Sequence, residues 1–141
     1  QGPWVRKTQK RIDRRGLDNA FVLKGDARVL LTLDIPAERL DHVFVLFPDP
    51  WWKARHSRRR RLFTPELLDV LARAMRPGAS LHLRTDVRRY LDSSAAFVAA
   101  HPAFSDASEE VVAWEHIHTR REKKCVEEEV PTWSRSWVRT R

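Results

Sequence analysis

The sequence predicts an α/β fold built on a parallel sheet. Predicted helices and strands alternate along the chain, which is typical of such sheets because a helix usually connects two parallel strands. The segment "DHVFVLF" (residues 41–47) reads as a continuous apolar run, the pattern of a strand buried on both faces. Asp26, Asp49 and Asp86 each follow a predicted strand. Because ligands of such sheets bind at the carboxyl ends of strands, these aspartates mark the expected functional edge.

The elements before this apolar run are a helix, a strand and a less regular segment. Residues 3–15 predict a helix, since Pro3 suits its first turn and Gly16 suits the left-handed conformation that ends helices. "AFVLK" (residues 20–24) predicts a short strand closed by Gly25 and Asp26. "RVLLTLDIPAERL" (residues 28–40) predicts a short helix followed by a loop.

The second half begins with a clear helix start at "TPE" (residues 64–66), which combines a capping hydroxyl, a first-turn proline and an acid. Apolar residues from Leu67 to Met75 continue this helix, and "PG" (residues 77–78) is expected to end it. "SLHLRTD" (residues 80–86) predicts a strand, after which Asp86 is expected to cap a helix that ends before Pro102. "VVAWEHIH" (residues 111–118) and "TWSRSWVRT" (residues 132–140) predict two antiparallel strands.

Size and charge restrict the classes of protein to which the chain can belong. Its 141 residues predict a single domain, residues 1–141, and no apolar run approaches the length of a membrane span. The net charge is +8, and residues 53–61 hold six basic residues and no acid, so the rest of the chain carries +2. A local excess of this kind predicts binding of a polyanion such as nucleic acid. Cys125 is the single cysteine, which excludes an internal disulfide and favours a reduced, cytoplasmic setting.

The segment "FPDPWWKARHSRRRR" (residues 47–61) resembles the signature of the tRNA (guanine-N7)-methyltransferases. In that signature Phe-Pro-Asp-Pro-Trp precedes a lysine two positions on and then a cluster of His, Lys and Arg. The stretches "RPGASLHLRTD" and "GLDNAFVLKGDA" reinforce the resemblance. It implies a Rossmann-like class I methyltransferase sheet, S-adenosyl-L-methionine as the cofactor, tRNA as the substrate and methyl transfer to N7 of a guanine.

The resemblance also implies roles for individual residues. Asp26 is implied to contact the adenine end of the cofactor, and Asp49 to lie in the active site beside the transferred methyl group. A further set is implied to bind the substrate: Lys53, Arg55, His56, Arg58, Arg59, Arg60, Asp86, Thr119 and Glu122. The last two match a late Thr-x-aromatic-Glu motif, from which this chain departs by having Arg121 at the aromatic position.

The glycine-rich loop that the family carries between its first strand and the following helix has no counterpart here, and the chain has four glycines in all. We therefore expect the sequence to represent the C-terminal part of a catalytic domain, without the first strand, the glycine loop and the second strand. Unpaired strand edges invite pairing with another chain. The expected consequence is a rearranged or intertwined homo-oligomer, or an ill-folded monomer.

The chemistry of guanine N7 agrees with these residue types. N7 carries a free lone pair, so the reaction needs alignment rather than a general base. A carboxylate such as Asp49 can accept hydrogen bonds from the guanine N1–H and amino group, while arginines can hold phosphates. Trp51 or Trp52 either stacks on a base or packs beneath the following loop.

Other functions remain open at this stage. A non-catalytic basic RNA-binding module is the main alternative, and a methyltransferase of another base or of a protein is a third. His116 and His118 would share one strand face, but no further residues have ligand spacing, so no metal site is predicted.

Overall fold

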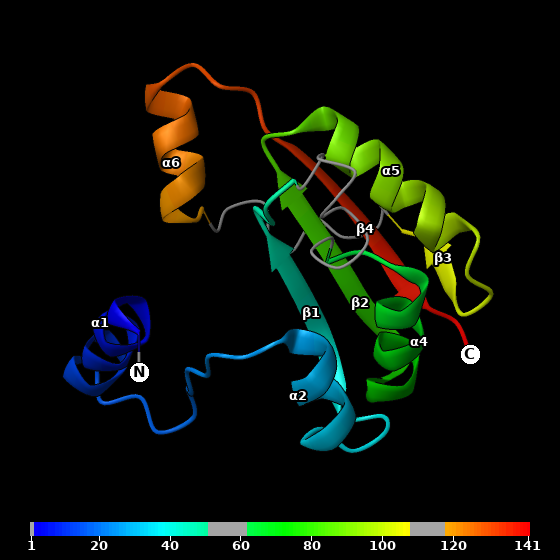
Figure 1. Cartoon of the computed structure of the whole chain (residues 1–141), viewed down its shortest axis with the longest axis horizontal. Coiled ribbons are helices and arrows are strands. Elements are labelled where there is room, and N and C mark those ends of the chain that lie inside the picture. The colour runs from blue at the N-terminus through cyan, green and yellow to red at the C-terminus, as the bar shows by residue number, and fades with distance from the viewer. Residues whose placement is uncertain (1, 51–61, 108–117) are drawn as a thin grey trace.

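The computed structural model describes residues 2–50, 62–107 and 118–141. Its centre is a four-stranded sheet with the strand order β1-β2-β4-β3 (Figure 1). The strands are β1 (Leu40–Leu46), β2 (Met75–Thr85), β3 (Phe104–Asp106) and β4 (Trp133–Arg139). The pair β1–β2 is parallel, whereas β4 runs antiparallel to both β2 and β3. The α/β class is therefore confirmed, with a mixed sheet of which β1 and β2 form the parallel part.

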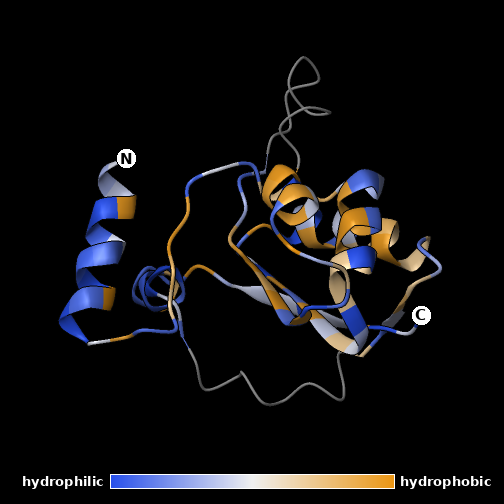
Figure 2. Cartoon of the chain, turned by 90° about the horizontal axis from the view of Figure 1, so that it is seen from below, coloured by the Kyte–Doolittle hydropathy of each residue, from blue (hydrophilic) through white to orange (hydrophobic). Residues whose placement is uncertain are grey.

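Five helices accompany the sheet in the described residues: α1 (Pro3–Arg14), α2 (Ala27–Leu33), α4 (Pro65–Ala74), α5 (Arg88–Ala99) and α6 (Arg120–Glu127). Helices α4 and α5 cover the same face of the sheet (Figure 2). Helix α2 lies beside α4, where the guanidinium of Arg73 donates hydrogen bonds to the carbonyls of Leu31 and, at 2.8 Å, of Ile35. This arginine satisfies carbonyl groups that the end of a short helix leaves without intrahelical partners.

The core lies between the sheet and helices α4 and α5. The predicted stripe of α4 is confirmed, because Leu67, Leu68 and Leu71 are all buried there. The start of this helix is also confirmed, since Thr64 Oγ1 accepts a hydrogen bond from the Leu67 N–H at 3.3 Å. The inward residues of β2 and the large indole of Trp137 on β4 complete the core.

One predicted strand does not form, and another forms without the burial expected of it. Residues 20–24 form no strand, and Phe21 and Leu23 are 84% and 72% exposed. An extended segment becomes a strand only when a neighbour satisfies its backbone groups, and no described strand pairs with this one. Strand β1 does form, but it is not buried on both faces. It lies at the edge of the described sheet, and Phe44 and Leu46 on its outer face are 41% and 44% exposed.

Helix α4 ends earlier than predicted. It ends at Ala74, and β2 begins at the next residue, so Pro77 and Gly78 lie within the strand. They produce an irregularity in the ladder, because β2 advances from Met75 to Ser80 while β1 advances only from Leu40 to His42. Gly78 has φ +83°, a conformation that suits glycine at such a bulge.

The C-terminal part of the chain agrees only in part with the sequence analysis. "TWSRSWVRT" forms β4, as predicted. Residues 111–117 of the other predicted strand lie outside the described residues. Strand β3 and helix α6 were not predicted.

Candidate functional site

The candidate site lies where β1 and β2 end. Leu46 pairs with Arg84 in the parallel ladder, and the Phe47 N–H donates to the Arg84 carbonyl at 2.8 Å. Asp49 and Asp86 therefore leave the sheet at the same side, where the carboxyl ends of β1 and β2 lie; we call this side the sheet edge of the site. Phe47 has φ +50°, which is uncommon for a residue other than glycine, and it precedes a proline. This turn takes the chain out of the strand and presents Asp49 at the surface, where it is exposed.

Helix α6 is attached to this edge by an ion pair that is largely shielded from water. Nη1 of Arg84 on β2 lies 2.8 Å from Oε1 of Glu122, and the two side chains are 17% and 11% exposed. The other oxygen of Glu122 accepts a hydrogen bond from the Thr119 N–H at 2.6 Å. Both carboxylate oxygens therefore hold internal partners. Figure 1 shows α6 close to the arrowheads of β1 and β2.

Thr119 and Glu122 also form a capping box at the start of α6. The Thr119 hydroxyl oxygen accepts a hydrogen bond from the Glu122 N–H at 3.1 Å. In return, the Glu122 carboxylate accepts the hydrogen bond from the Thr119 N–H. This arrangement satisfies two backbone donors that a helix N-terminus otherwise leaves open. Glu122 thus joins the cap of its own helix to the end of β2.

The electrostatic environment keeps Glu122 ionised. Burial acts to raise the pKa of its carboxyl, but the hydrogen bonds from Thr119 and the charge of Arg84 together outweigh burial. The pKa of Glu122 consequently lies below its ordinary value.

A second ion pair lies beside the first, and in this pair the acid follows β2 while the base belongs to α6. Arg121 donates from its Nε and Nη2 to Oδ2 of Asp86, and this contact raises the pKa of the guanidinium. Asp86 was predicted to cap α5, and this prediction is wrong. The cap position is Val87, whose N–H donates to Thr85 Oγ1 at 3.1 Å, while Asp86 turns toward the cation on α6. We call the pairs Arg84–Glu122 and Asp86–Arg121 the α6 clamp.

A polar cavity of ≈ 160 Å³ adjoins the clamp. It is lined by Arg84, Glu122, Thr132, Trp133 and Ser134. The pocket is open to solvent, and its lining offers one indole together with a guanidinium and a carboxylate that are paired with each other.

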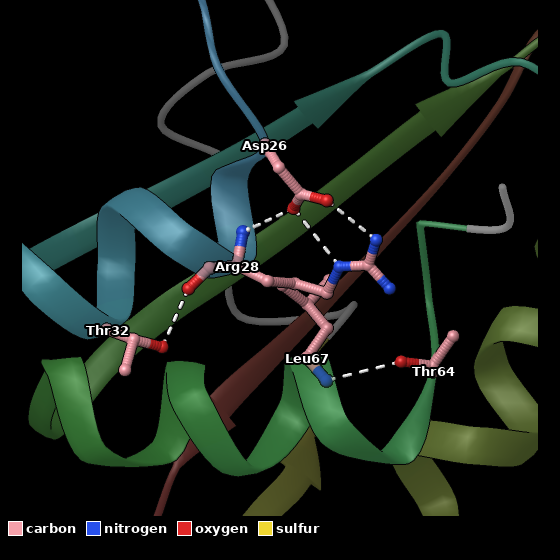
Figure 3. A network of polar contacts seen from close by, with 5 residues as sticks. All are labelled: Asp26, Arg28, Thr32, Thr64 and Leu67. Atoms are coloured by element: carbon pink, nitrogen blue, oxygen red, sulfur yellow. Dashed lines mark hydrogen bonds and ion pairs between the residues drawn. The ribbon is translucent and has the colours of Figure 1, made fainter. Parts of the chain in front are cut away.

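Asp26 has a different environment from the one its sequence position suggested. It follows no strand, because residues 20–24 form none; instead it caps α2 (Figure 3). Its Oδ1 accepts from the Arg28 N–H at 2.9 Å, and its Oδ2 lies 2.7 Å from Nη2 of the same arginine. The hydrogen bonds from Arg28 lower the pKa of Asp26.

The family model described as "Putative methyltransferase" matches residues 1–135. The chain is also 39% identical over 124 residues to a tRNA (guanine-N(7)-)-methyltransferase of Caulobacter vibrioides, covering 85% of this chain and 54% of that protein. The chain belongs to the tRNA (guanine-N7)-methyltransferase family. A relative of the same name from Nocardia farcinica is 45% identical over 100 residues, covering 71% of this chain and 37% of the relative. One from Nitrosococcus oceani is 33% identical over 130 residues, covering 92% and 55%.

The chain spans about half the length of the curated relatives that it matches. Membership of the methyltransferase family confirms the resemblance drawn from residues 47–61, and it agrees with the open α/β sheet. In the described residues no helix is long and apolar enough to cross a membrane. The same residues contain no cluster of three or more His, Cys, Asp or Glu side chains suited to a metal ion.

The structure brings together part of the set of residues that the family resemblance selected. Asp49 and Asp86 leave the same sheet edge, and α6 brings Thr119 and Glu122 to it. The basic positions Lys53, Arg55, His56, Arg58, Arg59 and Arg60 lie outside the described residues, as do Trp51 and Trp52. Sequence reasoning missed Arg84 and the pairing of Arg121 with Asp86. The spacing Thr-x-x-Glu at residues 119–122 was the available signal for α6, because it is the pattern of a capping box.

Proposed function

We propose that the protein to which this chain belongs transfers a methyl group from S-adenosyl-L-methionine to N7 of a guanine in tRNA. Support comes from the relatives named above, which carry this activity in their names, and from the motif at residues 47–61. The observation that carries the proposal is the common sheet edge, where Asp49 and Asp86 leave parallel strands and α6 is docked. This edge is where α/β sheets bind their ligands.

The carboxylates of Asp26 and Asp49 have the hydrogen-bonding properties that the cofactor requires. Carboxylates accept hydrogen bonds, and the adenine amino group of S-adenosylmethionine donates them, so Asp26 would hold that end. The side chain of Asp26 is 43% exposed, so its carboxylate remains accessible to such a donor. Asp49 would lie next to the methyl group that the bound cofactor supplies.

The guanine would be held by acceptors and donors at the same edge. Asp49 is exposed and follows the turn at Phe47, so its carboxylate can accept from the N1–H and amino group of the base. Asp86, Thr119 and Glu122 would complete the substrate side, the two carboxylates through acceptor positions that their contacts with Arg121, Arg84 and Thr119 do not use. Because N7 attacks the methyl carbon with its own lone pair, these residues act by alignment and not by removing a proton.

The basic positions of the signature would hold the tRNA backbone. Phosphate contacts orient a nucleic acid without reading its sequence. This role belongs to Lys53, Arg55, His56, Arg58, Arg59 and Arg60. Replacing residues 58–61 by alanine is expected to reduce the dependence of tRNA affinity on salt concentration.

Methyl transfer to bulk unmodified tRNA by the full-length gene product, with the modified base mapped, tests the proposal. Asp49→Ala is expected to abolish transfer, while Asp18→Ala, which alters an exposed aspartate near α1, is expected to leave it unchanged. Retained activity in Asp49→Ala would remove Asp49 from the mechanism. Binding of tRNA with no methylated base in any product would instead support the non-catalytic RNA-binding module.

The self-association expected from the sequence also belongs to this proposal. Strand β1 forms one edge of the described sheet, and its exposed Phe44 and Leu46 lie on an uncovered side of that strand. Open edges of this kind favour pairing between chains. Sizing chromatography of the chain is expected to show a species larger than its 16.6 kDa monomer, and a compact, cooperatively melting monomer would refute this. A reduced, cytoplasmic setting agrees with the buried free thiol of Cys125.

A further inference from the structure

Helix α1 carries a basic face that has no role in the site described above. Between Pro3 and Arg15 the chain has six basic residues and one acid, a net charge of +5 in a chain of net charge +8. Five of the six lie within the helix at the spacing i, i+1, i+4, i+5 and i+8, which places them on one side. They are Arg6, Lys7, Lys10, Arg11 and Arg14, and we call them the α1 basic face.

Burial shows that this side of the helix faces solvent. All five side chains are exposed, whereas the half-buried residues of α1, namely Val5, Gln9 and Ile12, lie on the other side. Val5 lines a hollow together with Val22 and Leu23, so the inner side of α1 is turned toward the segment that follows it. Figure 2 shows α1 as a predominantly hydrophilic helix.

Four of the five cations of this face, Lys7, Lys10, Arg11 and Arg14, are not balanced by an ion pair within the described residues. The one acid of the helix, Asp13, accepts a hydrogen bond from Gln9 at 2.8 Å. Like charges three and four residues apart repel each other, and the first turn contains no acid to complement the helix dipole. A bound polyanion would remove both unfavourable terms.

We propose that the α1 basic face is a second tRNA-binding surface, separate from the basic run at residues 53–61. The proposal rests on the proposed function for the identity of the polyanion. From Arg6 to Arg14 the face extends about 12 Å along the helix axis, enough to follow about three successive phosphates. At its N-terminal end Trp4 is 78% exposed, with the Lys7 ammonium 5.7 Å from its ring centroid. An exposed indole beside cations is a surface on which an unpaired base can stack.

A membrane surface is the other polyanion that a basic helix could meet, and the composition of α1 disfavours it. Membrane-surface helices bury a broad apolar side rich in Trp, Phe and Leu. The side opposite the α1 basic face offers only Val5 and Ile12 as aliphatic groups, and both are already half-buried.

The test measures the affinity of the chain for an unmodified tRNA transcript at several KCl concentrations. The variant is Lys7→Gln/Lys10→Gln/Arg14→Gln, which keeps residues compatible with a helix. The matched control is Arg39→Gln/Arg76→Gln/Arg141→Gln, which removes three charges outside α1, two of them at the amino ends of β1 and β2 and one at the C-terminal residue. Circular dichroism checks that both variants keep the parent's helix content.

Each lost phosphate contact lowers the slope of log Kd against log[KCl] by about 0.7–0.9, so the α1 variant is expected to lose about 2 units of slope. The control is expected to keep the parent slope. Equal slopes for variant and control would overturn the inference, as would absence of tRNA binding by the parent. Binding of phosphatidylserine vesicles that the α1 variant loses, with tRNA affinity unchanged, would assign the face to membranes instead. If the α1 variant loses slope but the full-length protein methylates no tRNA, this inference stands and the proposed function is refuted.

Discussion

Replacing Arg84 by methionine tests whether the buried pair of the clamp is what holds α6 on the sheet. Methionine keeps an unbranched side chain of similar reach but removes the charge. Glu122 would then remain 8% exposed without the cation that lies 2.8 Å from it. A buried carboxylate without its partner is unfavourable, so α6 should open more often.

The magnitude follows from the degree of burial. Exposed ion pairs contribute about 1 kcal/mol or less, whereas breaking a fully buried pair costs about 3–5 kcal/mol. With side chains 17% and 11% exposed, Arg84–Glu122 lies between these limits. We expect the free energy of opening α6 to fall by about 2 kcal/mol, which corresponds to roughly 30-fold faster amide exchange when the helix recloses faster than the open state exchanges.

Hydrogen exchange of residues 120–127, compared with that of residues 75–85, measures this local opening. The control is Lys124→Met, which removes the Lys124–Glu128 pair of the same helix, whose side chains are 58% and 48% exposed. Its effect should be a few tenths of a kcal/mol. Equal exchange of α6 in the two variants would refute the reasoning, because the shielded pair would then be worth no more than the exposed one.

The same pair predicts a dependence on pH. The pKa of Glu122 is lowered in the folded chain, so its contribution is complete above the ordinary value of 4.5 and is lost as the pH falls through the lower folded value. Stability measured by denaturant at pH 7 and pH 3.5 should therefore fall more in the parent than in Glu122→Gln. An identical fall in both would show that other carboxyl groups account for the acid sensitivity.

Three further predictions concern the scaffold. Burial, with smaller contributions from the charges of His42 and Arg84, lowers the pKa of His82 from 6.5 to about 4. The neutral imidazole therefore contributes fully to the stability of the fold above pH 6.5, and this contribution is lost as the pH falls toward 4. Denaturant unfolding at pH 7.5 and pH 5 should show a loss of about 2 kcal/mol in the parent that is absent in His82→Leu, and an equal loss in both would contradict the assignment. Arg73→Met removes the hydrogen bonds to the end of α2, so residues 27–33 should exchange about 10-fold faster while β2 is unaffected. Thr64→Ala removes the cap of α4 and should lower the free energy of unfolding by about 1 kcal/mol, whereas no change in thermal melting would show that the 3.3 Å contact contributes little.

Local signals in the sequence were sufficient for the elements that depend on local interactions. The start of α4 was predictable because Thr64, Pro65 and Glu66 act within one helical turn. Strand β4 and the buried stripe of α4 followed from the periodicity of their apolar residues. The family followed from residues 47–61, since Phe47-Pro48-Asp49-Pro50-Trp51 is a specific pattern and the relatives confirmed it.

Strand pairing and side-chain partners could not be predicted in the same way. Residues 20–24 have the composition of a strand, yet strand formation depends on a neighbour that satisfies the backbone. Asp86 has the residue type of a helix cap, but a cation 35 positions later in the chain competes for it. The capping box at Thr119 was visible in the sequence, although nothing local showed that its glutamate would meet Arg84.

The sequence by itself therefore determined the class of fold, the family, the start of α4 and the aspartates that follow β1 and β2. These features depend on contacts within a few residues or on a motif that is continuous in the chain. Only the tertiary structure decided that Asp86 pairs with Arg121, that Glu122 is shared between a helix cap and Arg84, and that β1 exposes one face. Those outcomes depend on which distant groups the sheet and α6 bring within a few ångströms, where charge and burial act together.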